Sequence, residues 1–168
     1  MLTPQGWWES PIAGKVRFQS KYEKLWCEFA DNNNLNWSKN KERFEYTSPF
    51  DGKQHKYIPD FIVEDDKGNK LYIEIKGMVR KADPAKFEAF PEDKRLVLLG
   101  YPELKQLGLP VVDPLEAYKG REVKPDQWPY KLLQNMPDFL EKGELTEEVK
   151  QKVSAEVFLE HLDNFKRT

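Results

Sequence analysis

Apolar and polar positions recur along this chain with two different periods, and these periods predict its elements. In residues 20–31 (SKYEKLWCEFAD) the apolar side chains have the spacing of one helix face, at Tyr22, Leu25, Trp26 and Phe29. Ser20 and Glu23 form the Ser-x-x-Glu pattern of a capping box at the start of this segment. We therefore expect an amphipathic helix over residues 20–31.

A period of two residues follows, which is typical of strands. Phe44 and Tyr46 alternate with charged neighbours, and the turn signal DG at residues 51–52 predicts a hairpin whose second strand returns through Tyr57. That strand is expected to continue into residues 61–63. The polar turn DDKGN then reverses the chain into KLYIEIK, which predicts a second hairpin.

Shorter segments complete this part of the chain. Asp83 as N-cap and Pro84 as the first helical residue predict a short helix through Phe90. The continuous apolar run at residues 95–99 predicts a strand at an inner position of a sheet. Prolines recur in residues 101–130, where we expect a connecting region.

Two more helices are expected after it. One is short and lies between Pro129 and Pro137. The other, of about five turns, follows a helical stripe made by Leu145, Val149, Val153, Val157, His161 and Phe165. The order of elements predicts the α/β class, with a mixed sheet flanked by helices in residues 10–122 and a helical C-terminal extension in residues 123–168.

Composition limits the chemistry available to such a domain. The 168 residues carry 27 Lys and Arg against 29 Asp and Glu, so binding to nucleic acid would have to rely on a local basic surface. One cysteine, Cys27, and two distant histidines, His55 and His161, exclude an internal disulfide and a zinc site of the usual kind, so a metal would be held by oxygen. The sequence shows neither a signal peptide nor a membrane span, which favours a cytoplasmic protein.

The second hairpin carries unusual charges. Glu74 and Lys76 are two residues apart and project from the same side of a strand, whereas Ile73 and Ile75 point to the other side. A turn centred near Lys67 pairs Asp60 with Glu74 across the hairpin. Two carboxylates that face each other are destabilising unless a cation compensates them, and oxygen ligands select a divalent ion such as Mg²⁺.

The sequence Pro59-Asp60 followed by Glu74-Ile75-Lys76 resembles the signature of the PD-(D/E)XK nuclease superfamily. The segments FQSKYE, YIPDF and YIEIKG are similar in order to those of phage junction-resolving endonuclease I and of a transposon-end-cleaving nuclease domain. The resemblance covers about residues 15–100 and implies a restriction-endonuclease-like fold. It also implies a metal-dependent DNA endonuclease, of a phage or mobile-element type, that hydrolyses phosphodiester bonds.

The resemblance assigns roles to individual residues. Asp60, Glu74 and the backbone carbonyl of Ile75 would bind Mg²⁺, with Mn²⁺ as a substitute. Lys76 would orient or deprotonate the attacking water. Glu23 would complete a second metal position or hold a water of the metal, although helix capping alone also explains a glutamate at this position.

Basic residues flank the motif on both sides and suit contacts with DNA phosphates that position a duplex without reading it. Lys53, Lys56, Arg80 and Lys81 are the residues that we expect to make these contacts. Acidic residues are interspersed among them, so a solvated surface of mixed charge is an equal alternative. Other basic residues in these flanks are Lys39, Lys41, Arg43 and Lys86.

Other functions are compatible with the same pattern. Glu74 and Lys76 could be a surface ion pair of little energetic value. The chain could also be an inactive or partner-dependent subunit that binds DNA with a nuclease fold. The 145–165 helix could join a homodimer or a protein partner, or it could pack on its own domain.

Overall fold

The β6–β7 hairpin lies at the centre of the computed structural model, which describes residues 5–113 and 143–168. The two strands belong to a four-stranded mixed sheet in which β8 pairs in parallel with β7 and the other pairings are antiparallel. In spatial order the strands are β3 (Trp37–Lys39), β6 (Phe61–Glu64), β7 (Lys70–Ile75) and β8 (Arg95–Leu99). The predicted α/β class is therefore confirmed at this level.

Turn chemistry sets the register of the central hairpin. The Asp65 side chain accepts hydrogen bonds from the backbone N–H groups of Lys67 and Asn69, and Gly68 takes a positive φ of 82° that favours glycine. Phe61 consequently pairs with Ile73 across the strands. This is the predicted register, and it carries Asp60 toward Glu74 beyond the end of the ladder.

Helix α1 (Lys21–Asn32) confirms the first predicted helix. Ser20 is its N-cap, and its hydroxyl oxygen accepts a hydrogen bond from the backbone N–H of Glu23. The buried face of α1 contributes Trp26, whose ring lies 5.9 Å from that of Phe61 and 5.7 Å from that of Phe158, centroid to centroid. Residues far apart in the sequence thus share one aromatic core.

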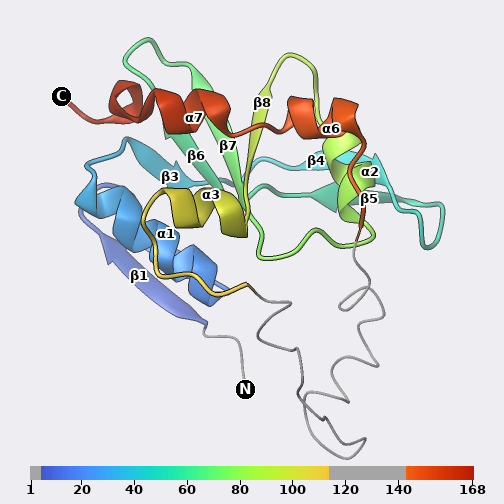
Figure 1. Ribbon diagram of the computed structural model, residues 1–168, viewed down its shortest axis with the longest axis horizontal. Coiled ribbons are helices and arrows are strands. Elements are labelled where there is room, and N and C mark those ends of the chain that lie inside the picture. Colours follow the sequence, from blue (N-terminus) through green and yellow to red (C-terminus); the bar gives the residue numbers. More distant parts are fainter. Residues whose placement is uncertain (1–4, 114–142) are drawn as a thin grey trace, which may run out of the picture.

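Both faces of the sheet are covered. One core cluster joins α1, α3 (Tyr101–Gln106) and α7 (Glu156–Glu160) to the side chains of Leu71, Ile73 and Ile75. The other joins α2 (Asp83–Glu88) and α6 (Glu147–Lys152) to Tyr72. In Figure 1, α1, α3 and α7 gather around β3, β6 and β7, whereas α2 and α6 lie beside β4 and β5.

The first predicted hairpin is a separate two-stranded sheet made by β4 (Phe44–Thr47) and β5 (Gln54–Tyr57). The expectation that its return strand continues into residues 61–63 is wrong, because β5 ends at Tyr57 and β6 begins at Phe61. Residues 58–60 form a link between the two sheets. The link brings Asp60 to the start of β6.

The single C-terminal helix of about five turns is a wrong prediction. The structure has α6, α7 and a 3₁₀ helix at Leu162–Phe165, and α6 ends before Val153. The backbone between α6 and α7 is used by β8: the carbonyl oxygen of Val153 accepts a hydrogen bond from Leu98 N at 2.9 Å, and that of Ser154 accepts one from the Arg95 guanidinium at 3.1 Å. These tertiary bonds outweigh continuous helix formation. Phe158 and Phe165 are buried in the same core as Trp26.

Other differences are local. Strand β8 lies at one end of the sheet formed by the described residues instead of at an inner position, although Leu96, Val97 and Leu99 are buried. Ala82, not Asp83, occupies the N-cap position of α2 without a side-chain capping hydrogen bond, and the helix ends at Glu88 instead of Phe90. The hairpin of β1 (Gly6–Ser10) and β2 (Gly14–Phe18), as well as helix α3 in the expected connecting region, did not follow from the sequence.

Two predictions fall on residues 114–142, outside the described part of the chain. They are the short helix between Pro129 and Pro137 and the boundary at residues 122–123. Among the described helices, none is both long and apolar enough to cross a membrane.

Candidate active site

The link before β6 is held in place by Asn40, which directly follows β3. The Asn40 side-chain amide donates a hydrogen bond to the carbonyl oxygen of Pro59 at 2.8 Å, and its backbone N–H donates one to the carbonyl oxygen of Asp60 at 3.1 Å. Asn40 is 2% exposed, so these bonds are shielded from water. The backbone of Asp60 is therefore fixed on both sides of its peptide unit.

Asp60 and Glu74 meet at the edge of the hairpin opposite its turn. The carboxylate oxygen Oδ2 of Asp60 accepts a hydrogen bond from the backbone N–H of Ile75 at 2.8 Å, and the carboxyl group of Glu74 lies close enough for its negative charge to act on Asp60. Glu74 is 4% exposed. The predicted pairing of the two acids is thus found in the structure.

The electrostatics of this pair follow from its burial. Burial, followed by the negative charge of Glu74, raises the pKa of Asp60 well above its usual range. Burial also raises the pKa of Glu74, and the nearby Lys76 opposes that shift. Keeping both carboxyl groups ionised is therefore costly unless a cation compensates their charge.

Tyr57 is a buried partner of Glu74. Its hydroxyl group donates a hydrogen bond to Glu74 Oε2 at 2.9 Å, and the side chain is 5% exposed. Because Tyr57 ends β5, it connects the β4–β5 sheet to the acidic pair. The bond fixes the direction of one carboxylate oxygen and leaves the other for different partners.

Lys76 follows β7 and forms an ion pair with Asp83, with 3.2 Å between Lys76 Nζ and Asp83 Oδ1. Lys86 Nζ lies 3.5 Å from the same oxygen, and the backbone N–H of Arg80 donates to Asp83 Oδ2 at 2.7 Å. Burial lowers the pKa of Lys76, but Glu74 and Asp83 outweigh it, and the pKa is raised overall. Lys76 is therefore a cation held between two carboxylates.

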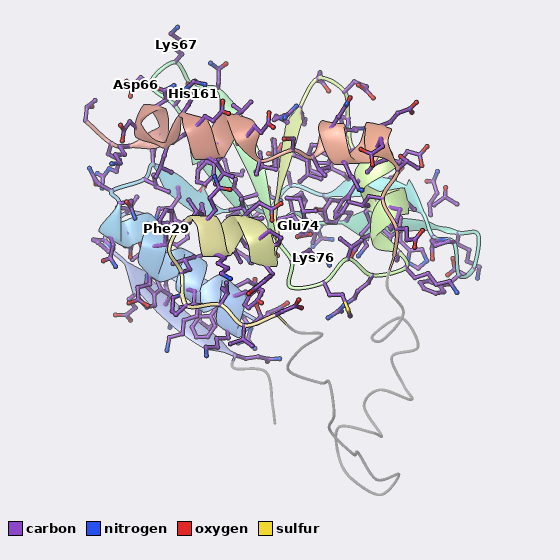
Figure 2. The ribbon with its side chains drawn as sticks, viewed as in Figure 1. Phe29, Asp66, Lys67, Glu74, Lys76 and His161 are labelled. Atoms are coloured by element: carbon purple, nitrogen blue, oxygen red, sulfur yellow. The ribbon has the colours of Figure 1, made fainter. Side chains whose placement is uncertain are left out.

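Figure 2 shows Glu74 and Lys76 together near the middle of the molecule, whereas Asp66 and Lys67 mark the far end of the same hairpin. The charged pair is thus embedded between elements and is not part of a solvated strand face. A purely surface ion pair between Glu74 and Lys76, one alternative from the sequence, does not fit the 4% exposure of Glu74.

Glu23 reaches the site from the first turn of α1. Its Oε2 accepts a hydrogen bond from the backbone N–H of Gln19 at 3.1 Å, and its Oε1 lies 3.7 Å from Lys39 Nζ. Burial, together with the negative charge of Asp60, raises the pKa of Glu23. Glu23 consequently supports the start of α1 and also lies near Asp60, so helix capping does not account for all of its interactions.

The four predicted DNA-contacting residues lie in the loop after β7 and in the β4–β5 hairpin. Arg80 and Lys81 lie in the loop after β7, close to Asp83, and Lys81 Nζ is 5.7 Å from the ring centroid of Phe50 at the tip of the β4–β5 hairpin. Lys53 is exposed in the same hairpin tip. Lys56 is on the strand, and Glu45 at 2.7 Å neutralises it. Lys53 and Lys81 thus share one end of the molecule, and Arg80 is next to Lys76.

The sequence did not predict three residues as members of the site. Tyr57 counted only as a strand residue, Asp83 only as a helix cap, and Lys39 only as one flanking cation among several. A carboxylate seven residues after a motif lysine was the available signal for Asp83. No local pattern indicated Lys39, because strand pairing between β3 and β6 brings it to the site.

The donor set fits a hard divalent cation. Among the described residues, no group of three or more His, Cys, Asp or Glu side chains is arranged to hold a metal. Two carboxylates at one point, with Glu23 nearby, are nevertheless what Mg²⁺ uses when it keeps several waters. Such an ion would compensate the negative charges that burial disfavours at Asp60 and Glu74.

Comparisons of the chain with protein-family models, with curated proteins and with solved structures found no match.

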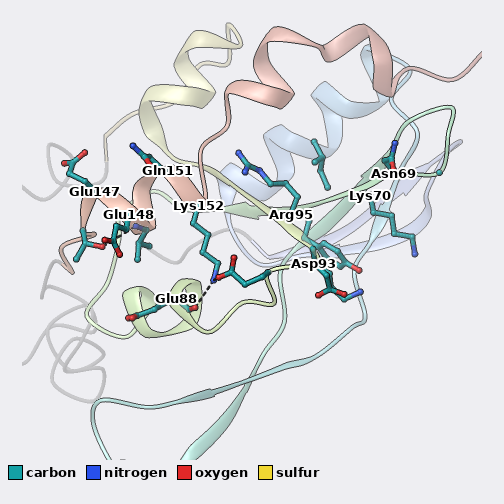
Figure 3. Close-up of a pocket in the computed structure, with 16 residues that line it drawn as sticks. Asn69, Lys70, Glu88, Asp93, Arg95, Glu147, Glu148, Gln151 and Lys152 are labelled. Atoms are coloured by element: carbon teal, nitrogen blue, oxygen red, sulfur yellow. Dashed lines mark hydrogen bonds and ion pairs between the residues drawn. The ribbon is translucent and has the colours of Figure 1, made fainter.

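A different part of the molecule contains the larger hollow, of about 1480 Å³, shown in Figure 3. It lies between the start of β8, α2 and α6, and Lys152 bridges it by donating to the carbonyl oxygen of Glu88 at 2.8 Å. Its walls carry acidic side chains such as Glu92, Asp93 and Glu147. None of the site residues lines this hollow. Acidic and basic side chains converge instead at Asp60 and Glu74, which makes that pair the candidate site.

Proposed function

We propose that this chain is a Mg²⁺-dependent DNA endonuclease with a restriction-endonuclease-like fold. The observation that carries the proposal is the contact between Asp60, which is partly exposed, and the buried Glu74, with Lys76 beside them directly after β7. Two adjacent acids of which one is buried, next to a lysine, are costly for stability and have no evident structural benefit, which is typical of a functional site. The agreement with the spacing of the PD-(D/E)XK signature supports the same conclusion.

Each residue has a role in this proposal. Asp60 and Glu74 would hold Mg²⁺, and Tyr57 keeps the Glu74 carboxylate in the required direction. When bound, the ion would supply positive charge to the phosphate oxygens and lower the pKa of the attacking water. The Ile75 backbone lies beside the pair through its N–H bond to Asp60, which is compatible with the expected carbonyl ligand.

Lys76 contributes a positive charge to the same point. Its raised pKa favours orientation of the water and stabilisation of the negatively charged transition state over removal of a proton. Asp83 holds the ammonium group in position through its ion pair with Lys76. Lys53, Arg80 and Lys81 would meet DNA phosphates near the β4–β5 hairpin tip.

The test is cleavage of supercoiled plasmid, linear duplex and a four-way junction with Mg²⁺ or Mn²⁺. We expect products from the wild type and none from Asp60→Ala or Lys76→Ala. Matched controls are Glu64→Gln and Lys70→Ala, because Glu64 and Lys70 are an acid and a lysine on the same two strands, 3.9 Å apart at the far end of the hairpin. These controls should cut like the wild type.

Two results would contradict the proposal. Cutting that survives both site substitutions would point to a contaminating nuclease. DNA binding without cutting, under all metal conditions, would favour the partner-dependent or inactive binding subunit that the sequence also allows. A gel-shift measurement on the same substrates separates these two cases.

A further inference from the structure

Lys39 is the last residue of β3, and its position is fixed by the sheet. It pairs in register with Phe61, the residue directly after Asp60, and the next residue, Asn40, binds the backbone of Pro59 and Asp60. The backbone of Lys39 is therefore fixed beside Asp60. The side chain of Lys39 is 31% exposed.

The ammonium group of Lys39 has two partners. It lies 3.7 Å from Glu23 Oε1, and it sits over the ring of Phe61 with 4.7 Å to the ring centroid. The ion pair with Glu23 directs the side chain toward α1, and the cation–π contact with Phe61 adds to its attachment. The positive charge of Lys39 opposes the rise in pKa of both Glu23 and Asp60, which is consistent with a location near the two acids.

We infer that the Lys39 ammonium group occupies the cation position beside Glu23 and Asp60, so that the site takes one divalent ion, at Asp60 and Glu74, and not two. This inference rests on the proposed function, because it concerns the same carboxylates. It also changes the expected role of Glu23. Glu23 binds the fixed ammonium of Lys39 and does not ligate a second metal.

Charge balance supports a single divalent ion. Three acids, Glu23, Asp60 and Glu74, face Lys39 and Lys76, and Asp83 is shared by Lys76 and Lys86. In their ionised forms these four acids and three lysines sum to one negative charge, and one divalent ion reverses it to one positive charge, which a phosphodiester then neutralises. A second divalent ion would leave two further positive charges in a partly buried site, where repulsion is only weakly screened.

The test counts Mn²⁺ ions per chain by electron paramagnetic resonance and by calorimetry on the full-length protein without DNA. We expect one ion per chain in the wild type, lost in Asp60→Ala. Lys39→Met removes the ammonium but keeps most of the apolar stem, so a second, weaker ion should bind. That second ion should disappear in the double variant Lys39→Met with Glu23→Gln.

Lys39→Arg is the matched control, because it retains the positive charge and should keep one ion per chain. Thermal unfolding of each variant verifies that it is folded. Two ions in the wild type, with one of them lost in Glu23→Gln, would overturn the inference and leave the nuclease proposal intact. One ion in folded Lys39→Met would also overturn it. No binding that depends on Asp60 in the wild type would instead overturn the proposed metal site, and the inference with it.

Discussion

The ion pair between Asp83 and Lys76 gives the sharpest test of the site. Asp83→Asn keeps the shape of the side chain and an oxygen that can accept from Arg80 N, but it removes the charge that faces the ammonium groups of Lys76 and Lys86. Asp83 is 1% exposed, whereas the side chains of Lys76 and Lys86 are 19% and 23% exposed. Both lysines lose a buried counter-charge in the variant.

The size of the effect can be worked out from this exposure. Removing one partner of a fully buried ion pair costs about 3–5 kcal/mol of unfolding free energy. Because both ammonium groups reach solvent, we expect a smaller loss of about 2–3 kcal/mol. For a chain of this size, that loss lowers Tm by roughly 4–12 °C.

The assay is thermal and urea unfolding of the wild type, Asp83→Asn, Lys76→Met and the double variant. Lys86 remains near Asp83 in Lys76→Met, so the cycle isolates the Asp83 and Lys76 term, for which we expect about 1–2 kcal/mol of coupling. The control is Asp66→Asn in the exposed β6–β7 turn, with a change within about 0.5 kcal/mol. In cleavage, Asp83→Asn should lower kcat and leave KM for DNA nearly unchanged.

An absence of coupling would refute the reasoning, because it would mean that Lys76 does not depend on Asp83. A Tm of Asp83→Asn equal to that of the wild type would have the same meaning. A decrease in Tm with unchanged kcat would restrict Asp83 to a structural role.

Three further predictions concern the core, the acidic pair and the metal. Phe158→Ala should cost about 3–5 kcal/mol in urea unfolding, because Phe158 is fully buried against Trp26; a loss below about 1 kcal/mol would show that α7 is not part of the core. The folded-state pKa values of Asp60 and Glu74 are raised, so these groups favour the folded state at low pH and lose this contribution as the pH rises. The Tm without metal should therefore increase as the pH falls from about 8 toward about 5. The increase should be smaller in the double variant Asp60→Asn with Glu74→Gln, and an equal increase would contradict the assignment. At pH 8, saturating Mg²⁺ should raise the Tm of the wild type but not that of Asp60→Ala, and an equal rise in both proteins would place the metal elsewhere.

Local signals explain what could be predicted from the sequence. The turn at Asp65 and Gly68 and the alternation along β7 determine the register, and from the register follows the meeting of Asp60 and Glu74. The start of α1 follows from Ser20 in the same way. These features depend on residues close in the chain, where propensity and periodicity act.

Long-range contacts explain which features could not be predicted from the sequence. Lys39 enters the site through pairing of β3 with β6, and Asp83 meets Lys76 through the loop between β7 and α2. The break between α6 and α7 depends on hydrogen bonds from Leu98 and Arg95, which precede their acceptors Val153 and Ser154 by 55 and 59 residues. The helical periodicity of the sequence continues through Val153, and this local pattern contains no information about a hydrogen bond to a distant strand.

The hydrogen bonds that interrupt the C-terminal helices have a consequence for aggregation. Strand β8 (RLVLL) is an apolar edge strand of the described sheet, and such an edge is a template for pairing with another chain. The segment around Val153 and Ser154 occupies part of that edge by accepting from Leu98 N and the Arg95 guanidinium. Removal of the C-terminal residues would therefore expose an apolar edge strand together with the core around Phe158 and Phe165. We expect such a truncated protein to form β-rich assemblies.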